Sequence, residues 1–204
     1  MSATTLERPQ ELTRSKRLKE ATNTTHDRLD TSIMDHKPFS SRERYGLFVK
    51  VQHAFHRDID ALYDDASLDA LLPDLPGRRR FNLIERDLAD LAIEPFPFKT
   101  PPLFPANAAV DLPTALGWLY VAEGSNLGAA FLLKAAAKLG LAETFGARHL
   151  SGAPEGRGLH WRTFTQALDT VPLSDLEEAR VVAGAEAAFR HVHGLVKEMF
   201  ASGQ

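Results

Sequence analysis

One histidine, His26, is the first residue whose type and position could do chemistry. It lies on a stretch with helical periodicity whose inward face is built by Leu18, Thr22, Thr25 and Leu29. A neutral imidazole is a common ligand of haem iron, and the absence of cysteine and the presence of only three methionines narrow the choice of axial ligand. A core histidine bonded to the backbone is the alternative, and position alone favours it.

Lys19 lies seven residues before His26, nearly two helical turns away. The two side chains therefore share a face at a separation of about 10 Å along the axis. An ammonium group there could meet a haem propionate while the imidazole binds the iron. An ordinary surface lysine has the same spacing, so the pair alone leaves both interpretations open.

A second unusual feature is the segment Gly124-Ser125-Asn126-Leu127-Gly128, inside the most apolar helical stretch of the chain. Each glycine within a helix costs about 1 kcal/mol relative to alanine, so two of them need a compensating use. Because they are four residues apart, they bare one face, against which a flat ligand could approach and around which the helix could kink. Close packing of two helices through small residues is the alternative.

Polar side chains also interrupt an apolar helix at Gln52, His53 and His56. The two histidines resemble half of a metal site, but di-iron bundles use Glu-x-x-His, and none of the eight histidines has a glutamate three residues before it. We therefore expect no metal centre built from side chains alone. His53 is expected at the surface, whereas Gln52 and His56 could bond into a buried water network.

Two further features have mainly structural interpretations. The run Arg78-Arg79-Arg80 is typical of a solvated face, although one member could point inward to orient water or a carboxylate. Trp161 is expected to pack in the core.

These residues lie on predicted helices. Apolar residues recur at spacings of three and four, no run of alternating β-branched residues occurs, and residues 40–43 (Ser-Ser-Arg-Glu) resemble a capping box. The sequence predicts an all-α, single-domain helical bundle with helices over residues 12–31, 40–63, 67–72, 78–91, 112–140, 160–170 and 174–200.

Residues 93–113 hold six of the twelve prolines and are predicted to form an irregular connection. It is not expected to be a flexible linker, because Phe96, Phe98, Leu103 and Phe104 need burial. A glycine-rich loop is predicted over residues 146–158.

Composition excludes several classes of protein. The 204 residues carry 24 basic and 27 acidic side chains, a net charge of −3 that gives no general affinity for nucleic acid. No cysteine is present, which excludes disulfides and thiolate sites and fits a reducing compartment. No apolar run is long enough for a signal core or a membrane span, so a cytoplasmic protein is expected. Residues 1–11 are predicted to be a disordered or loosely ordered tail, and residues 12–204 one domain.

Four segments resemble the bacterial biliverdin-producing haem oxygenases, of the type found in Gram-negative pathogens. They read SKRLKEATNTTHDRLD, LGWLYVAEGSNLGAAFLLK, FGARHL and EGRGLHWRTF, and they span most of the chain in the expected order. The combination of GSNLGAAF with an upstream Thr-His-Asp is specific. The resemblance implies an all-helical fold in which haem lies between a proximal and a distal helix.

The resemblance also implies roles for individual residues. His26 matches the iron ligand, the distal helix approaches the haem through its glycines, and a water network supplies protons. The implied catalytic residues are Gly124, Ser125, Gly128, Gln52, His56, Arg80 and Trp161. The implied haem-binding residues are His26, Lys19, Tyr120, Asn126, Lys134 and Phe189.

One position departs from the pattern of close relatives, and two others bear on the site of ring cleavage. A tyrosine that helps to bind a propionate is matched here by Val192, and His191, His193 or Arg190 could replace it. Relatives that cleave at unusual meso carbons carry an asparagine near position 19 and a lysine near position 34. Because this chain has Lys19 and Met34, cleavage at the α-meso carbon is expected.

The expected activity is the conversion of haem b, both cofactor and substrate, to biliverdin, CO and ferrous iron. It uses O2 and an external electron donor of the ferredoxin, flavodoxin or reductase type, and it serves iron acquisition. A monomer that binds neither nucleic acid nor membrane is expected. The alternatives are a haem carrier or sensor that does not degrade haem and, disfavoured by the missing cysteine, a thiaminase-type enzyme.

Overall fold

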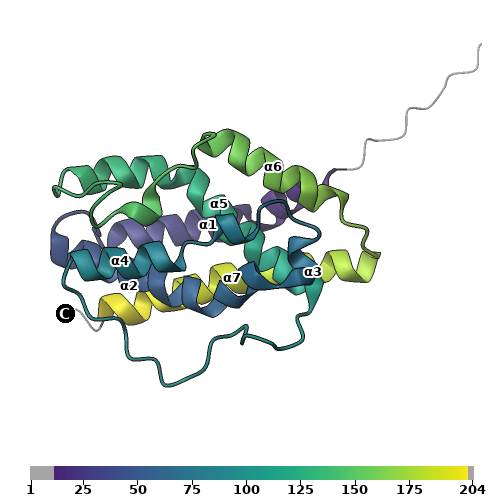
Figure 1. Ribbon diagram of the computed structural model, residues 1–204, viewed down its shortest axis with the longest axis horizontal. Helices are drawn as coiled ribbons and strands as arrows, with labels where there is room; N and C mark the ends of the chain where they lie inside the picture. The colour runs from purple at the N-terminus through teal and green to yellow at the C-terminus, as the bar shows by residue number, and fades with distance from the viewer. Residues whose placement is uncertain (1–11, 202–204) are drawn as a thin grey trace, which may run out of the picture.

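The computed structural model describes residues 12–201, which form a helical bundle (Figure 1). No β-strand occurs within this range. The predicted all-α, single-domain fold is confirmed, whereas the predicted tail at residues 1–11 lies outside the described residues. The helices are α1 (Arg14–Asp35), α2 (Arg42–Ile59), α3 (Ala66–Asp69), α4 (Phe81–Asp90), α5 (Leu112–Ala137), α6 (Arg157–Thr170) and α7 (Asp175–Ala201), with 3-10 turns η1 (Asp60–Asp64), η2 (Pro76–Arg78) and η3 (Arg148–Leu150).

The C-terminal helix α7 is the centre of the bundle, because it packs against α5, α1 and α2. Where it crosses α5, Gly117 and Gly184 face each other. A Cβ added to Gly117 would lie 2.2 Å from the carbonyl oxygen of Val181, and one added to Gly184 would lie 2.5 Å from that of Thr114. Only glycine fits on either side of this crossing.

Helix α1 is held at both of its ends. At the N-terminal end, the buried Arg14 guanidinium donates to the Val171 carbonyl at 2.7 Å and to Glu178 at 2.7 Å. At the C-terminal end, the ring of His36 stacks on Phe200 with 4.6 Å between centroids. These contacts join α1 to the end of α6 and to both ends of α7, and α1 continues four residues beyond the predicted end at residue 31.

Several predicted boundaries were wrong by one to four residues. The N-cap of α2 is Ser41, whose side chain accepts from the Arg44 amide, so the cap lies one residue after the predicted one. Helix α4 begins at Phe81 because Arg78 belongs to the 3-10 turn before it. Helix α6 begins at Arg157, so the last two residues of the predicted 146–158 loop are helical.

The proline-rich connection over residues 93–110 has no helix or strand, as predicted. The Arg57 guanidinium lies 4.2 Å from the centre of the Phe98 ring and joins the connection to α2. Phe104 faces the core, with its ring 5.3 Å from Trp118. The expected burial of Leu103 was wrong: because Phe104 takes the inward position, Leu103 is 53% exposed.

None of the helices within residues 12–201 is both long and apolar enough to cross a membrane.

Candidate functional site

The second half of α5 carries a face that is open at Gly128 and that, among the described residues, only Trp161 of α6 approaches at Gly124. A Cβ added to Gly128 would have no described atom within 4 Å, and one added to Gly124 would meet only the ring edge of Trp161, at 3.5 Å. The close packing of helices through small residues therefore occurs at Gly117 and not at these two glycines. The helix runs without interruption through both positions.

Apolar side chains border the two glycines on the same face. Leu127 and Phe131 lie within one turn of Gly128, and they are 45% and 79% exposed. Tyr120 lies one turn before Gly124 and is buried, with its ring 5.4 Å from that of Trp161. An apolar surface with a bare backbone at its centre is suited to a flat apolar ligand.

His26 projects from the middle of α1, beside the inward face of Leu18, Thr22 and Leu29. Its side chain is 55% exposed, and its Nδ1 lies 3.4 Å from Oδ2 of Asp30. The buried ring of Phe189 on α7 lies 5.9 Å away, edge to face. The imidazole is therefore neither buried nor enclosed, and it is accessible as a ligand.

Each of the two helices also carries a lysine, before His26 on α1 and after Gly128 on α5. Lys19 is exposed and lines an open depression with Lys16, Glu20 and Asn23. Lys134 is exposed on the last turns of α5. Both are long, exposed side chains of the kind that can reach a ligand carboxylate at the edge of a site.

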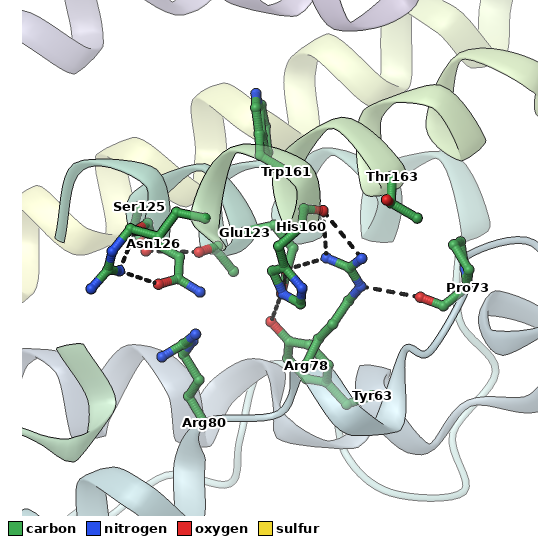
Figure 2. A network of polar contacts seen from close by, with 12 residues as sticks. Tyr63, Pro73, Arg78, Arg80, Glu123, Ser125, Asn126, His160, Trp161 and Thr163 are labelled. Atoms are coloured by element: carbon green, nitrogen blue, oxygen red, sulfur yellow. Dashed lines mark hydrogen bonds and ion pairs between the residues drawn. The ribbon is translucent and has the colours of Figure 1, made fainter. Parts of the chain in front are cut away.

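A buried ion-pair network lies on another side of α5 (Figure 2). The Glu123 side chain, 4% exposed as a residue, accepts from the Tyr63 hydroxyl at 3.0 Å and from the Arg78 guanidinium at 3.0 Å. Arg78 also donates to the carbonyl of His160 at 3.2 Å. Burial, followed by the charge of Glu123, raises the pKa of Tyr63 well above its ordinary value. The network ties α5 to α6 and to the turn before α4.

Arg80 and His56 lie beside this network. Arg80 donates to the carbonyl of His149 at 2.6 Å. His56 is buried, and burial, followed by the charge of Arg80, lowers its pKa to about 3, so its imidazole is neutral. Gln52 lies half-buried one turn earlier on α2.

Comparison with known proteins identifies the family to which the chain belongs. The Heme oxygenase family model matches residues 12–198. The chain belongs to the haem oxygenase family. It is 42% identical over 188 residues to Heme oxygenase PigA of Pseudomonas aeruginosa, covering 92% of this chain and 93% of that one.

Solved structures of haem oxygenases agree with this assignment. The NO- and CO-bound haem oxygenase from Neisseria meningitidis superposes with a TM-score of 0.87 at 43% identity, over 94% of each chain. A haem oxygenase from Leptospira interrogans shares the fold at 18% identity, with a TM-score of 0.70 over 92% of this chain and 100% of that one.

The residues that the family resemblance implied do not all lie on the face of α5 that carries Gly124 and Gly128, which we call the glycine face. Trp161 covers Gly124, and Figure 2 shows its ring pointing away from Arg80. Asn126 is buried on the side of α5 opposite Gly124, where its Oδ1 accepts from Arg157 at 2.9 Å. Ser125 is exposed, and its hydroxyl donates to the carbonyl of Ala122 at 2.7 Å. Asn126 is therefore not brought to the glycine face.

The α7 residues proposed to replace the missing tyrosine also differ in their surroundings. Val192 itself is buried. His191 binds Asp58 of α2 at 2.8 Å, and Arg190 pairs with Glu186 at 3.3 Å. His193 lines a depression with residues of α1.

Two expectations for polar residues were wrong. His53 is buried rather than exposed, because its ring packs 5.0 Å from that of Phe81. The arginine run is not a solvated face: Arg80 is partly buried, and Arg79 pairs with Asp60 at 2.5 Å. The alternative of an inward arginine that meets a carboxylate holds for the buried Arg78. Each finds a partner that is distant in sequence.

Sequence reasoning missed the partners of this network, most notably Glu123. A signal was present, because Glu123 is the only acidic residue of the apolar helix α5. A carboxylate in such a helix needs a buried cation, and three consecutive arginines lie upstream.

Within residues 12–201, no group of three or more His, Asp or Glu side chains is arranged to hold a metal ion.

Proposed function

We propose that this haem oxygenase binds haem b between α1 and the glycine face of α5 and opens the porphyrin ring to biliverdin, CO and ferrous iron. The observation that carries the proposal is the bare backbone at Gly128, where a Cβ would meet no described atom. Each such glycine lowers the stability of the helix by about 1 kcal/mol relative to alanine, and the close approach of a flat substrate compensates for this loss.

The residues present fit haem as the substrate. The exposed apolar side chains Leu127 and Phe131 would cover one face of the porphyrin, and the accessible imidazole of His26 would bind the iron from α1. The Phe189 ring beside His26 supplies an apolar wall. Lys19, Lys134 and His193 are the candidates for the two propionates.

The bound haem supplies the iron chemistry that activates O2, and the protein controls protons and access. A neutral histidine ligand avoids the strong electron donation of a thiolate, which favours O–O cleavage. His56 and Arg80, with Gln52, would hold ordered water that delivers protons. Trp161 and the glycine backbone would limit the space above the iron, and with Lys19 and Met34 we expect α-meso cleavage.

The physiological setting is a further part of the proposal. The chain has no cysteine, which fits the cytoplasm. Electrons would come from an external donor of the ferredoxin, flavodoxin or reductase type, and the released iron would serve iron acquisition. We infer that the protein acts as a monomer.

Spectroscopy of the haemin complex tests the activity directly. The protein is mixed with haemin and a reductant under air, and the Soret band is followed together with bilin absorbance. Loss of the Soret band with formation of biliverdin is expected. A stable haem spectrum without bilin would instead identify a haem carrier or sensor.

The ligand is tested by His26→Ala, with His36→Ala at the C-cap of the same helix as the matched control. His26→Ala should give a ferric haem spectrum without histidine ligation, because it removes the accessible imidazole. His36→Ala should leave the spectrum unchanged, because that ring stacks on Phe200. A native spectrum from His26→Ala would show that another residue binds the iron.

A further inference from the structure

A second histidine, His149 on η3, is fixed by a fully buried carboxylate. Asp87 on α4 has no exposed surface, and its Oδ2 lies 2.7 Å from Nδ1 of His149. The same carboxylate accepts the backbone amides of His149 and Arg148, each at 2.9 Å. With the Arg148 guanidinium, which donates at 3.2 Å, four hydrogen bonds converge on one aspartate in the interior.

These contacts determine which ring nitrogen carries the proton. Burial acts to raise the pKa of Asp87, but the hydrogen bonds from His149 and Arg148 outweigh it and hold that pKa below its ordinary value. Burial also lowers the pKa of His149, so the pair consists of an ionised carboxylate and a neutral imidazole. Because a carboxylate can only accept, Nδ1 of His149 must donate, and Nε2 is left as an acceptor.

Three buried imidazole nitrogens have no hydrogen-bond partner among residues 12–201: Nδ1 of His53, Nδ1 of His56 and Nε2 of His149. The last two belong to rings on which the charge of Arg80 acts. The Arg80 guanidinium bonds to the His149 carbonyl at 2.6 Å, and its charge contributes to lowering the pKa of both rings. Buried polar atoms in proteins are nearly always bonded, to ordered water where no protein group reaches them.

We propose that Asp87 acts as a positioning residue: it holds His149 as the Nδ1–H tautomer, so that Nε2 accepts from a buried water molecule shared with Nδ1 of His56. Asp87 thereby sets the direction of hydrogen bonding in the polar interior that includes His56 and Arg80. Its effect on catalysis rests on the proposed function, in which His56 holds water for proton delivery. The tautomer and the bridging water do not rest on it.

A structural role is the alternative, because Asp87 also bonds to Arg148 and joins α4 to η3. Asp90 provides the matched control. It pairs with the same Arg148 side chain and accepts the amide of Gly146 at 2.7 Å, but no bond joins it to the His149 ring. Asp87→Asn and Asp90→Asn therefore both weaken the α4–η3 connection, and only the first changes the partner of Nδ1.

Ring nitrogen NMR of the haem-free protein, labelled with ¹⁵N-histidine, is the test. In the wild type, His149 should show a protonated Nδ1 and an unprotonated Nε2. In Asp87→Asn, the amide can donate to Nδ1, so His149 should shift toward the Nε2–H tautomer and the His56 ring signals should move with it. Asp90→Asn should leave both rings as in the wild type.

The outcomes separate this proposal from the proposed activity. A protonated Nε2 on wild-type His149 would overturn it without any variant, even if Asp87→Asn failed to fold. Unmoved His56 signals in a folded Asp87→Asn would overturn the shared water. If the tautomers behave as expected and Asp87→Asn forms biliverdin more slowly than Asp90→Asn, both proposals stand. If no protein sample degrades haem, the activity proposal alone fails.

Discussion

Replacing Gly128 with alanine should stabilise the protein and weaken haem binding at the same time. An alanine at this helical position stabilises by about 1 kcal/mol relative to glycine, because the added Cβ meets no described atom. For a chain of this length that corresponds to a rise in Tm of about 2–4 °C.

The same methyl group would project into the space assigned to the porphyrin. If haem contacts the backbone at Gly128, the added carbon forces it away and costs about 1–3 kcal/mol. That cost lowers the affinity about 5-fold to 150-fold. Stability and affinity should therefore change in opposite directions.

Urea unfolding of the haem-free protein and haemin titration at the Soret band measure the two effects. Gly194→Ala on α7 is the matched control: its Cβ also meets no described atom, so it should stabilise equally and bind haem normally. Gly117→Ala is the opposite case, and it should destabilise by about 1–3 kcal/mol because its Cβ would lie 2.2 Å from the carbonyl oxygen of Val181. Unchanged haem affinity in Gly128→Ala would refute the placement of haem on this face.

The remaining predictions concern two ion pairs and the buried His56. Glu123→Gln should cost about 3–5 kcal/mol in the free energy of unfolding, because it leaves the Arg78 guanidinium buried without its carboxylate. Glu186→Gln, which removes an exposed pair, should change that free energy by less than about 1 kcal/mol in the same urea titration. The pKa of His56 is about 3 in the folded protein, below the value near 6.5 in the unfolded chain. The neutral imidazole therefore contributes its full share of the free energy of unfolding above pH 6.5, and this contribution is lost as the pH falls. Between pH 7 and pH 5 this loss is about 2 kcal/mol in the free energy of unfolding. If that free energy falls as much in His56→Gln as in the wild type, the low pKa assigned to His56 is contradicted.

The fold could be predicted from the sequence because the spacing of apolar residues along the chain indicates the helices. The ends of the helices were less accessible, since they depend on contacts with distant segments. Helix α1 runs to Asp35 because His36 stacks on Phe200, which is more than 160 residues away. The cap at Ser41 rather than Ser40 depends on the path of the turn before it.

The candidate site was only partly accessible. Gly124 and Gly128 stood out because glycine is locally unfavourable in a helix, and the anomaly needed no tertiary information. Apart from Glu123, the one acidic residue of the apolar helix α5, the interior polar residues gave no such local signal. Whether Arg78 or His53 is buried depends on partners that only the tertiary fold brings together, namely Glu123 and the ring of Phe81.

The anchoring of α1 at both ends has a consequence for the cost of ligand binding. Arg14 and His36 fix the axial position and the rotation of a helix whose middle section is open on one side. A ligand that reaches His26 therefore meets an imidazole on a preorganised backbone, and little of its binding energy is spent on ordering the helix. The affinity then depends chiefly on what the ligand contacts and not on folding that it must induce.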